Sequence, residues 1–422
     1  MKRGRIVFKI KGSRPLSGFI EVSGSKNAAL PIMACTILQK GEYILKRVPI
    51  LQDTLTMVQL LESLGLVIER DKNTYKIINN GIKNYEAAYD LVSTMRASFI
   101  VAGPLLGNLG KAKVSLPGGC ALGPRPVNFH LEAFQQMNVN VSIEHGYVNL
   151  NTTELKGNNI MLPFPSVGAT QNIMAAAVKA KGMTKIENAA KEPEVVEMAN
   201  FLVKMGAKIE GIGSSTIIIE GSKDLKSVEY EIIPDRIEAG TYIILSQLFD
   251  GAIEVKNIEP KHLTGFLNTL EKMGSKFSIE GKNIKVLTKL NEIKPIDITT
   301  MPHPGFPTDL QPQTMVLLAS LEGHSIIEET LFSNRFMAVP ELVRMGAKIR
   351  TVDNHFAYIE GKANFSSAEV GAPDLRAGMA LMLAALIADG ETSLSRAYYI
   401  DRGYENIEMK LLKLGADIVR AK

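Results

Sequence analysis

A phrase that ends a helix recurs six times along this chain, at a regular spacing of about seventy residues, and such a fixed period indicates internal repeats. Each time, an amphipathic run closes on a glycine or an asparagine and leads into a β-rich segment. The closing residues are Gly65, Asn138, Gly206, Gly274, Gly346 and Gly415. Glycine and asparagine tolerate the left-handed conformation that ends many helices, so the one asparagine keeps the geometry. The chain is therefore predicted to consist of six copies of one unit.

A second series of glycines runs in step with the first. Each of these ends a run of small and apolar residues and precedes a β-rich segment; they are Gly41, Gly110, Gly182, Gly251, Gly323 and Gly390. Runs such as 173–178 and 380–385 are apolar on nearly every side, which is typical of a helix buried all round. The β-rich segments alternate instead, which predicts sheets with one face toward water. Each unit is predicted as strand, buried helix, strand, amphipathic helix, strand, strand.

The length of 422 residues exceeds what one hydrophobic core supports, so we expect two domains. The predicted fold class is α/β, with three units to a domain, helices inside and sheets outside. The sixth unit lacks its last strand, while the segment 6–10 stands spare at the start. The N-terminal strand is therefore expected to complete the last unit. The predicted domains are 26–234 and 1–25 plus 235–422, with the chain crossing between them near 25 and 235.

Composition and residue spacing exclude several classes of function and site. The net charge of +4 is too slight a bias to suggest nucleic acid. The two cysteines, Cys35 and Cys120, form no CxxC pair, so neither a zinc site nor a disulfide framework is indicated, which fits a reducing cytoplasm. The histidines show no HExxH spacing, and His303 is interpreted as loop packing. We expect a cytoplasmic protein with no membrane span, no metal, no cofactor and no obligate protein partner.

The composition of the segment 116–126 is not explained by the needs of the fold alone. Three glycines and three prolines in eleven residues exclude a helix or a central strand, so a loop of prescribed shape is predicted. It carries Cys120 and Arg125. A thiol on a loop near fixed positive charge is set up to be reactive, because its thiolate is favoured there. The alternative is a small buried hydrophobe in a tight turn, which is the usual fate of a lone cysteine.

The predicted starts of the buried helices gather unexpected polar and charged residues. In chain order these are Ser25-Lys26-Asn27, Thr94-Met95-Arg96, Ser166-Val167-Gly168, Asp235-Arg236, Thr308-Asp309 and Asp374-Leu375-Arg376. Helix N-termini present unpaired N–H groups and a partial positive charge, so several facing one space make an anion site. For any one helix, ordinary N-caps with solvated basic neighbours explain the pattern equally well. Repetition favours an anion-binding cleft between the two domains, for a small and multiply negative ligand.

Several motifs together resemble those of one enzyme family. They are Lys26-Asn27, the run 95–98, the Cys120 loop, the runs 166–170, 302–309 and 334–336, Asp374-Leu375-Arg376 and the run 401–404. On these motifs, over its full length, the chain is similar to the UDP-N-acetylglucosamine 1-carboxyvinyltransferases. The resemblance implies a two-domain inside-out α/β barrel. It also implies transfer of the enolpyruvyl group of phosphoenolpyruvate to the 3-hydroxyl of UDP-N-acetylglucosamine with release of phosphate, the first committed step of peptidoglycan synthesis.

The resemblance also assigns roles to residues. It implies that Cys120 is a general acid, can carry a pyruvate adduct and is alkylated by fosfomycin, and that Asp309 accepts the sugar hydroxyl proton. Phosphoenolpyruvate would be held by Lys26, Arg125 and Arg402. The implied contacts to the UDP-sugar are Asn27, Arg96, Arg125, Pro126, Val127, Asn128, Phe129, Ser166, Val167, Gly168, Asp309 and Leu331, with Arg335, Asp374 and Arg376 completing the charged ring. Asn128 stands where many members have Asp, and Phe164 stands where some have Lys.

Two other functions compete with this interpretation. A 3-phosphoshikimate 1-carboxyvinyltransferase shares the fold and the donor, but it lacks the cysteine-bearing loop and its acceptor has no nucleotide. A non-catalytic nucleotide-sugar sensor would have kept the fold and lost turnover, and the presence of Cys120 and Asp309 argues against it.

Overall fold

The computed structural model describes residues 6–92, 95–116 and 127–421, and the chain divides into two compact units. Unit 1 comprises residues 6–23 and 234–421, and unit 2 comprises the described residues between 24 and 233. Within the described residues, the chain passes from one unit to the other between Ser23 and Gly24 and between Ile233 and Pro234. No described helix has the length and apolar character needed to cross a membrane.

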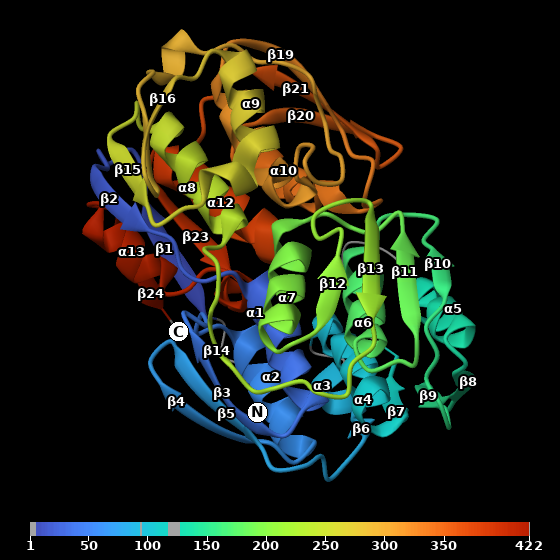
Figure 1. The fold of residues 1–422 in the computed structure, drawn as a ribbon. Helices are drawn as coiled ribbons and strands as arrows, with labels where there is room; N and C mark the ends of the chain where they lie inside the picture. The colour runs from blue at the N-terminus through green and yellow to red at the C-terminus, as the bar shows by residue number, and fades with distance from the viewer. Residues whose placement is uncertain (1–5, 93–94, 117–126, 422) are drawn as a thin grey trace. The chain divides into compact units, whose positions relative to one another are not determined.

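The described residues of unit 2 form three four-stranded sheets (Figure 1). In hydrogen-bonded order they are β14 (Glu229–Glu231), β3 (Gly41–Lys46), β5 (Thr74–Asn79) and β4 (Val67–Asp71); β6 (Glu86–Ala87), β7 (Lys111–Ser115), β9 (Tyr147–Asn151) and β8 (Asn140–Glu144); and β10 (Asn159–Met161), β11 (Met183–Glu187), β13 (Thr216–Glu220) and β12 (Lys208–Glu210). Its helices are α1 (Lys26–Cys35), η1 (Thr36–Leu38), α2 (Gln52–Ser63), α3 (Tyr89–Val92), η2 (Arg96–Val101), α4 (Ala102–Leu109), α5 (Asn128–Gln136), α6 (Val167–Ala177) and α7 (Pro193–Lys204).

Unit 1 repeats the same plan. Its sheets are β16 (Phe277–Glu280), β17 (Asn283–Val286), β15 (Ile253–Lys256) and β2 (Gly18–Glu21); β18 (Ile298–Thr299), β19 (Gly323–Glu328), β21 (Phe356–Gly361) and β20 (Lys348–Val352); and β22 (Glu369–Gly371), β23 (Glu391–Ser395), β1 (Val7–Lys11) and β24 (Asp417–Ala421). Its helices are α8 (Arg236–Leu248), η3 (Pro260–Leu263), α9 (Thr264–Met273), η4 (Leu290–Glu292), η5 (Thr308–Leu310), α10 (Gln311–Ser320), η6 (Arg335–Ala338), α11 (Val339–Arg344), α12 (Leu375–Ile387), η7 (Ala397–Arg402) and α13 (Ile407–Lys413).

All six sheets share one pattern of pairing. One edge strand runs parallel to its neighbour, and the other two pairings are antiparallel, as in β10 with β11, β11 with β13 and β13 with β12. The predicted helix-closing residues all have positive φ, between 67° at Asn138 and 108° at Gly206. The second series is also positive throughout, from 68° at Gly110 to 145° at Gly41. The six-unit prediction is confirmed, although the described strands form separate sheets and not one closed barrel.

The N-terminal strand completes the last sheet, as the sequence predicts. Strand β1 lies between β23 and β24 and is antiparallel to both, with Phe8 opposite Leu394 on one side and Arg420 on the other. The sixth copy of the unit is therefore built from both ends of the chain.

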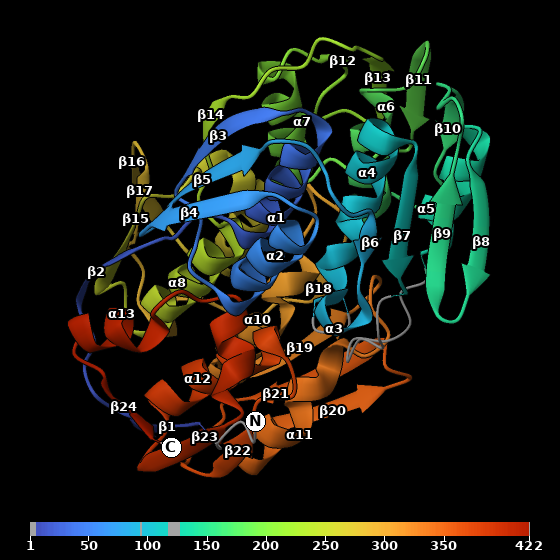
Figure 2. The ribbon, with the colours of Figure 1, turned by 90° about the horizontal axis from the view of Figure 1, so that it is seen from below.

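The small-residue helices form the interior of each unit. In unit 2, α4 packs against α6 and α1 packs against η2, and in unit 1, α10 packs against both α8 and α12. Every residue of α10 is buried. Figures 1 and 2 show the sheets on the outside of each unit, with β3, β4 and β5 lying over α1 and α2. Each unit has its own apolar core.

Two buried helices do not begin where the sequence places them. The segments at Arg96 and at Thr308-Asp309 are 3-10 turns, η2 and η5, and the α-helices start only at Ala102 and Gln311. Proline explains both cases. Pro104 and Pro312 have no N–H to donate, and each ring clashes with the carbonyl four residues earlier in an α-helix. The turn before each proline therefore tightens to 3-10.

Candidate active site

Lys26 begins α1 and is buried, with 7% of its surface exposed. Ser25 caps the helix by accepting a hydrogen bond from the Ala28 N–H at 3.3 Å. A lysine at a helix N-terminus opposes the helix dipole, and α1 has no acidic residue in its first turn. Asp53 of α2 supplies the opposite charge, since its Oδ2 lies 3.1 Å from Lys26 Nζ. Asn27 follows at a half-buried position.

The start of α6 is a second predicted contact point in unit 2. Ser166 caps this helix by accepting from the Ala169 N–H at 3.3 Å, and Val167 and Gly168 form its first turn. All three predicted residues are half-buried. A Cβ on Gly168 would lie 3.3 Å from Cε1 of His130, so the imidazole ring packs against this turn.

The start of α5 carries three further predicted contacts. Val127 is the N-cap residue, and Asn128 and Phe129 form the first turn. The Asn128 side chain donates from Nδ2 to Glu132 Oε1 at 3.4 Å, and Phe129 packs against the core of unit 2. Cys120, Arg125 and Pro126 lie outside the described residues. Arg96 begins η2, and its backbone alone is described.

Asp309 is the centre of a charged cluster in unit 1. Its Oδ1 accepts from Nη2 of Arg335 at 2.5 Å, and its Oδ2 accepts from Nε and Nη2 of Arg376 at 3.2 and 3.0 Å. Both arginine side chains are almost fully buried, whereas the Asp309 side chain is 29% exposed. Burial alone would lower the pKa of Arg376, but the neighbouring Asp309 carboxylate raises it above its ordinary value. Arg376 therefore stays charged despite its burial.

A buried polar framework fixes Arg376. Asp374 caps α12 by accepting from the Arg376 and Ala377 N–H groups at 2.7 and 3.0 Å. The guanidinium lies over the Tyr404 ring, 5.6 Å from its centroid. The Tyr404 hydroxyl is 2.9 Å from Thr241 Oγ1, on α8. It also accepts from Gln313 Nε2, on α10, at 3.1 Å, so the framework ties Arg376 to the other two interior helices.

Leu331 is joined to the same cluster through Glu329, which the sequence analysis missed. Glu329 accepts from the Leu331 N–H at 2.9 Å with Oε1 and from Thr308 Oγ1 at 2.9 Å with Oε2. Thr308 immediately precedes Asp309. Arg402 ends η7, which packs against α12, the helix that carries Arg376.

Cys35 is not a second reactive thiol. It is fully buried in α1, and burial raises the pKa of its thiol far above the ordinary value. A neutral buried thiol is inert. Among the described residues, no group of three or more His, Cys, Asp or Glu side chains is placed to hold a metal ion.

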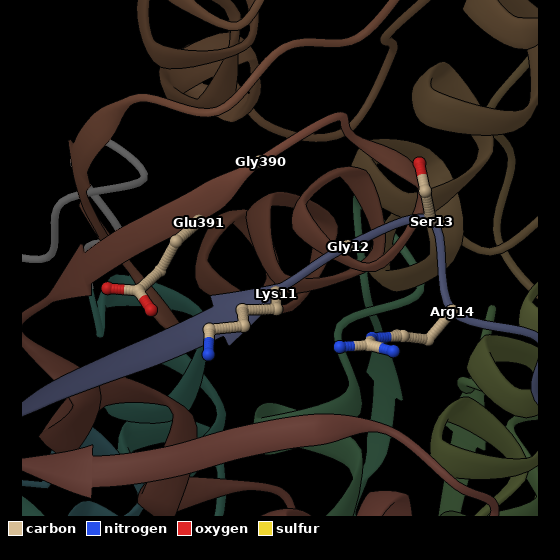
Figure 3. Close-up of a pocket in the computed structure, with 6 residues that line it drawn as sticks. All are labelled: Lys11, Gly12, Ser13, Arg14, Gly390 and Glu391. Carbon is tan, nitrogen blue, oxygen red and sulfur yellow. The ribbon is translucent and has the colours of Figure 1, made fainter.

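A surface hollow in unit 1 lies apart from the Asp309 cluster. It is lined by Lys11, Gly12, Ser13, Arg14, Gly390 and Glu391 (Figure 3). Ser13 Oγ donates to the Ala388 carbonyl, so the hollow lies at the C-terminal end of α12, whereas Arg376 lies at the other end. A helix of this length spans about 20 Å. Lys11 and Arg14 both pair with the exposed Asp417, which is typical of a solvated surface.

The fold and the site define a class of protein. A family model described as EPSP synthase (3-phosphoshikimate 1-carboxyvinyltransferase) matches residues 10–411. The enolpyruvyl transferase NikO from Streptomyces tendae has a similar fold, with a TM-score of 0.91 at 24% identity, covering 99% of this chain and 100% of that one. EPSP synthase from Acinetobacter baumannii covers the same shares, with a TM-score of 0.76 at 17% identity. The chain is a member of the EPSP synthase family.

Relatives of similar sequence show to which group within the EPSP synthase family the chain belongs. The UDP-N-acetylglucosamine 1-carboxyvinyltransferase 1 of Caldanaerobacter subterraneus subsp. tengcongensis is 48% identical over 413 residues, which are 98% of this chain and 99% of that protein. The UDP-N-acetylglucosamine 1-carboxyvinyltransferase of Geotalea uraniireducens is 47% identical over 413 residues, with the same coverage. Within the family, the chain belongs with the UDP-N-acetylglucosamine 1-carboxyvinyltransferases, as the resemblance implied.

Proposed function

We propose that this enzyme transfers the enolpyruvyl group of phosphoenolpyruvate to the 3-hydroxyl of UDP-N-acetylglucosamine, releasing phosphate, in the first committed step of peptidoglycan synthesis. The observation that carries the proposal is the identity of 48% over 98% of the chain with a relative named for this acceptor. The EPSP synthase from Acinetobacter baumannii, whose structure is known, has a sequence identity of only 17% to this chain. The cytoplasm is the proposed location.

In unit 1, Asp309 is proposed to accept the proton of the sugar hydroxyl. Two guanidinium groups hold its carboxylate, and their hydrogen bonds occupy both of its oxygens. Phosphate and carboxylate groups of bound substrates attract the same guanidinium groups. We therefore expect substrate binding to weaken the hold of Arg335 and Arg376 on Asp309, so that the base becomes competent only when the anions are in place.

In unit 2, Lys26 and the first turn of α6 are proposed to bind the anionic groups of the substrates. Lys26 is a compact charge on a flexible stem, already oriented by Asp53, and suits the phosphate or carboxylate of phosphoenolpyruvate. The N–H groups of the first turn of α6 suit the diphosphate of the sugar nucleotide. Arg96, Asn27 and the start of α5 would complete that contact.

Cys120 is proposed as the acid. The sugar oxygen adds to C2 of phosphoenolpyruvate as its proton passes to Asp309, and the thiol gives its proton to C3, which becomes a methyl group. The thiolate then takes a proton back from that methyl group as the bond from C2 to the phosphate oxygen breaks. The double bond is restored, and the leaving phosphate takes the proton held by Asp309. One acid and one base thus serve both addition and elimination.

A phosphate-release assay with each candidate acceptor tests the proposal. Phosphoenolpyruvate with UDP-N-acetylglucosamine is expected to release phosphate stoichiometrically with enolpyruvyl product, whereas phosphoenolpyruvate with shikimate 3-phosphate is expected to release none. Turnover with shikimate 3-phosphate alone would assign the chain to the sister reaction. Binding of UDP-N-acetylglucosamine without turnover would identify a sensor.

A further inference from the structure

One buried amide in unit 2 joins three helical segments. Asn172 lies in α6, with none of its surface exposed. Its Oδ1 accepts from the Gly103 N–H of α4 at 2.7 Å. Its Nδ2 donates to the Phe99 carbonyl of η2 at 3.1 Å and lies 2.9 Å from Nδ1 of His130, on α5. An amide of this kind is fully used, since both its donors and its oxygen have partners.

These contacts fix the tautomer of His130. The Gly103 N–H can only donate, so the atom that faces it must be the amide oxygen, and the Phe99 carbonyl can only accept, so it faces the amide nitrogen. The second N–H of Asn172 then points at His130 Nδ1, which has to accept. His130 is therefore neutral, with its proton on Nε2. The His130 ring also contacts the Phe99 ring edge to face, with the ring centroids 5.2 Å apart and the ring planes at 89°.

The joined segments are the ones that carry the predicted contacts to the sugar nucleotide. Phe99 lies three residues after Arg96, His130 follows Asn128 and Phe129, and Asn172 lies about one turn after Gly168. The His130 ring packs against the Gly168 turn. Helices α4 and α6 also approach closely, since a Cβ on Gly103 would lie 2.2 Å from the Asn172 carbonyl oxygen.

We propose that Asn172 is a positioning residue for the sugar-nucleotide site of unit 2. It holds His130 in the neutral Nε2–H form against the first turn of α6 and sets the spacing between η2, α5 and α6. This inference rests on the proposed function for its kinetic consequence. The hydrogen-bond network itself does not depend on that function.

Asn172→Asp is the most informative variant, because it keeps the shape and the oxygen facing Gly103 but cannot donate. Nitrogen-15 NMR at neutral pH is expected to show wild-type His130 protonated at Nε2 only, and Asn172→Asp protonated at both ring nitrogens. The KM for UDP-N-acetylglucosamine is expected to rise about tenfold or more with kcat within about threefold, as for lost uniform binding. Gln171→Ala is the matched control, since Gln171 is a buried polar neighbour that contacts the Glu194 carbonyl of α7 instead.

Each outcome decides between the two hypotheses. A wild-type enzyme without turnover contradicts the proposed function, while the NMR result still tests the network. Normal turnover with an unchanged KM in Asn172→Asp, or a wild-type His130 protonated at Nδ1, overturns the inference. If Asn172→Asp does not fold, His130→Asn, whose oxygen can accept from Asn172, is expected to keep a KM about tenfold below that of His130→Leu. Equal KM values in those two variants would overturn it as well.

Discussion

The Nζ atom of Lys26 lies 3.1 Å from Oδ2 of Asp53, and both side chains are buried in unit 2. The pair places a cation at the end of a helix where the dipole is unfavourable to it, and a carboxylate from the neighbouring helix offsets the charge. A buried pair of this kind adds little net stability, but losing one partner is expensive. A cation kept at such a position suits an anionic ligand.

Asp53→Asn is expected to destabilise the enzyme by about 3 kcal/mol, because the buried Lys26 loses its carboxylate partner. Phosphoenolpyruvate, if it binds Lys26, is expected to raise the Tm of the variant more than that of the wild type. Thermal unfolding with and without phosphoenolpyruvate measures both effects, with Asp71→Asn on the surface as the control. Equal ligand-induced shifts in variant and wild type would separate Lys26 from the substrate.

Asp309→Asn is expected to bind UDP-N-acetylglucosamine but to lose at least about a hundredfold in kcat, which is the scale of a lost general base. The amide cannot take up a proton, and it cannot accept from both Arg335 and Arg376 as the carboxylate does. Calorimetric titration and steady-state kinetics test this, with the exposed Asp297→Asn as the control. An unchanged kcat would remove Asp309 from the mechanism.

Fosfomycin is expected to label Cys120 and not Cys35. Cys35 is fully buried, and burial raises the pKa of its thiol, so the nucleophilic thiolate is suppressed in the folded protein. Peptide mass spectrometry measures the site of alkylation. Cys120→Ser is expected to abolish labelling and most turnover, whereas Cys120→Asp, still a proton donor, is expected to keep activity and escape the inhibitor. Equal labelling of the two cysteines in folded enzyme would count against the assignment.

Glu197 is expected to make stability depend on pH. It is 8% exposed in α7, and burial raises its pKa to about 7, against hydrogen bonds from Tyr230 and the Ile233 backbone that lower it. The unfolded carboxyl titrates near 4.3. Its contribution to stability is therefore full below about pH 4.3 and is lost as the pH rises through about 7, a change on the order of 3 kcal/mol.

Glu197→Gln removes this titration. The variant is expected to match the wild type near pH 4 and to be more stable above pH 7, by up to about 3 kcal/mol. Denaturant unfolding across this pH range measures the difference, and Glu210→Gln on the surface serves as the control. Parallel stability curves for Glu197→Gln and the wild type would contradict the prediction.

The sequence predicted the repeating architecture because its signals are local. A glycine or asparagine with positive φ marks each helix end by itself, and the spare N-terminal strand could be matched to the incomplete sixth unit by counting. The same local reasoning misplaced the starts of the α-helices α4 and α10, because the effect of Pro104 and Pro312 on the preceding turn was overlooked. The partners Asp53, Glu329, His130 and Asn172 were missed for a different reason. Each contact joins elements distant in sequence, and an acid or an amide in a helix pattern does not show which element packs against it.

The strand β1 is synthesised long before the two strands that pair with it. Residues 7–11 emerge from the ribosome long before the strands that flank them, which lie in 391–395 and 417–421. At about 5–20 residues added per second, β1 waits on the order of tens of seconds for its neighbours. Throughout that interval it is an unpaired edge, and the exposed Lys9 and Lys11 put charge on its outer face, which discourages pairing with other nascent chains.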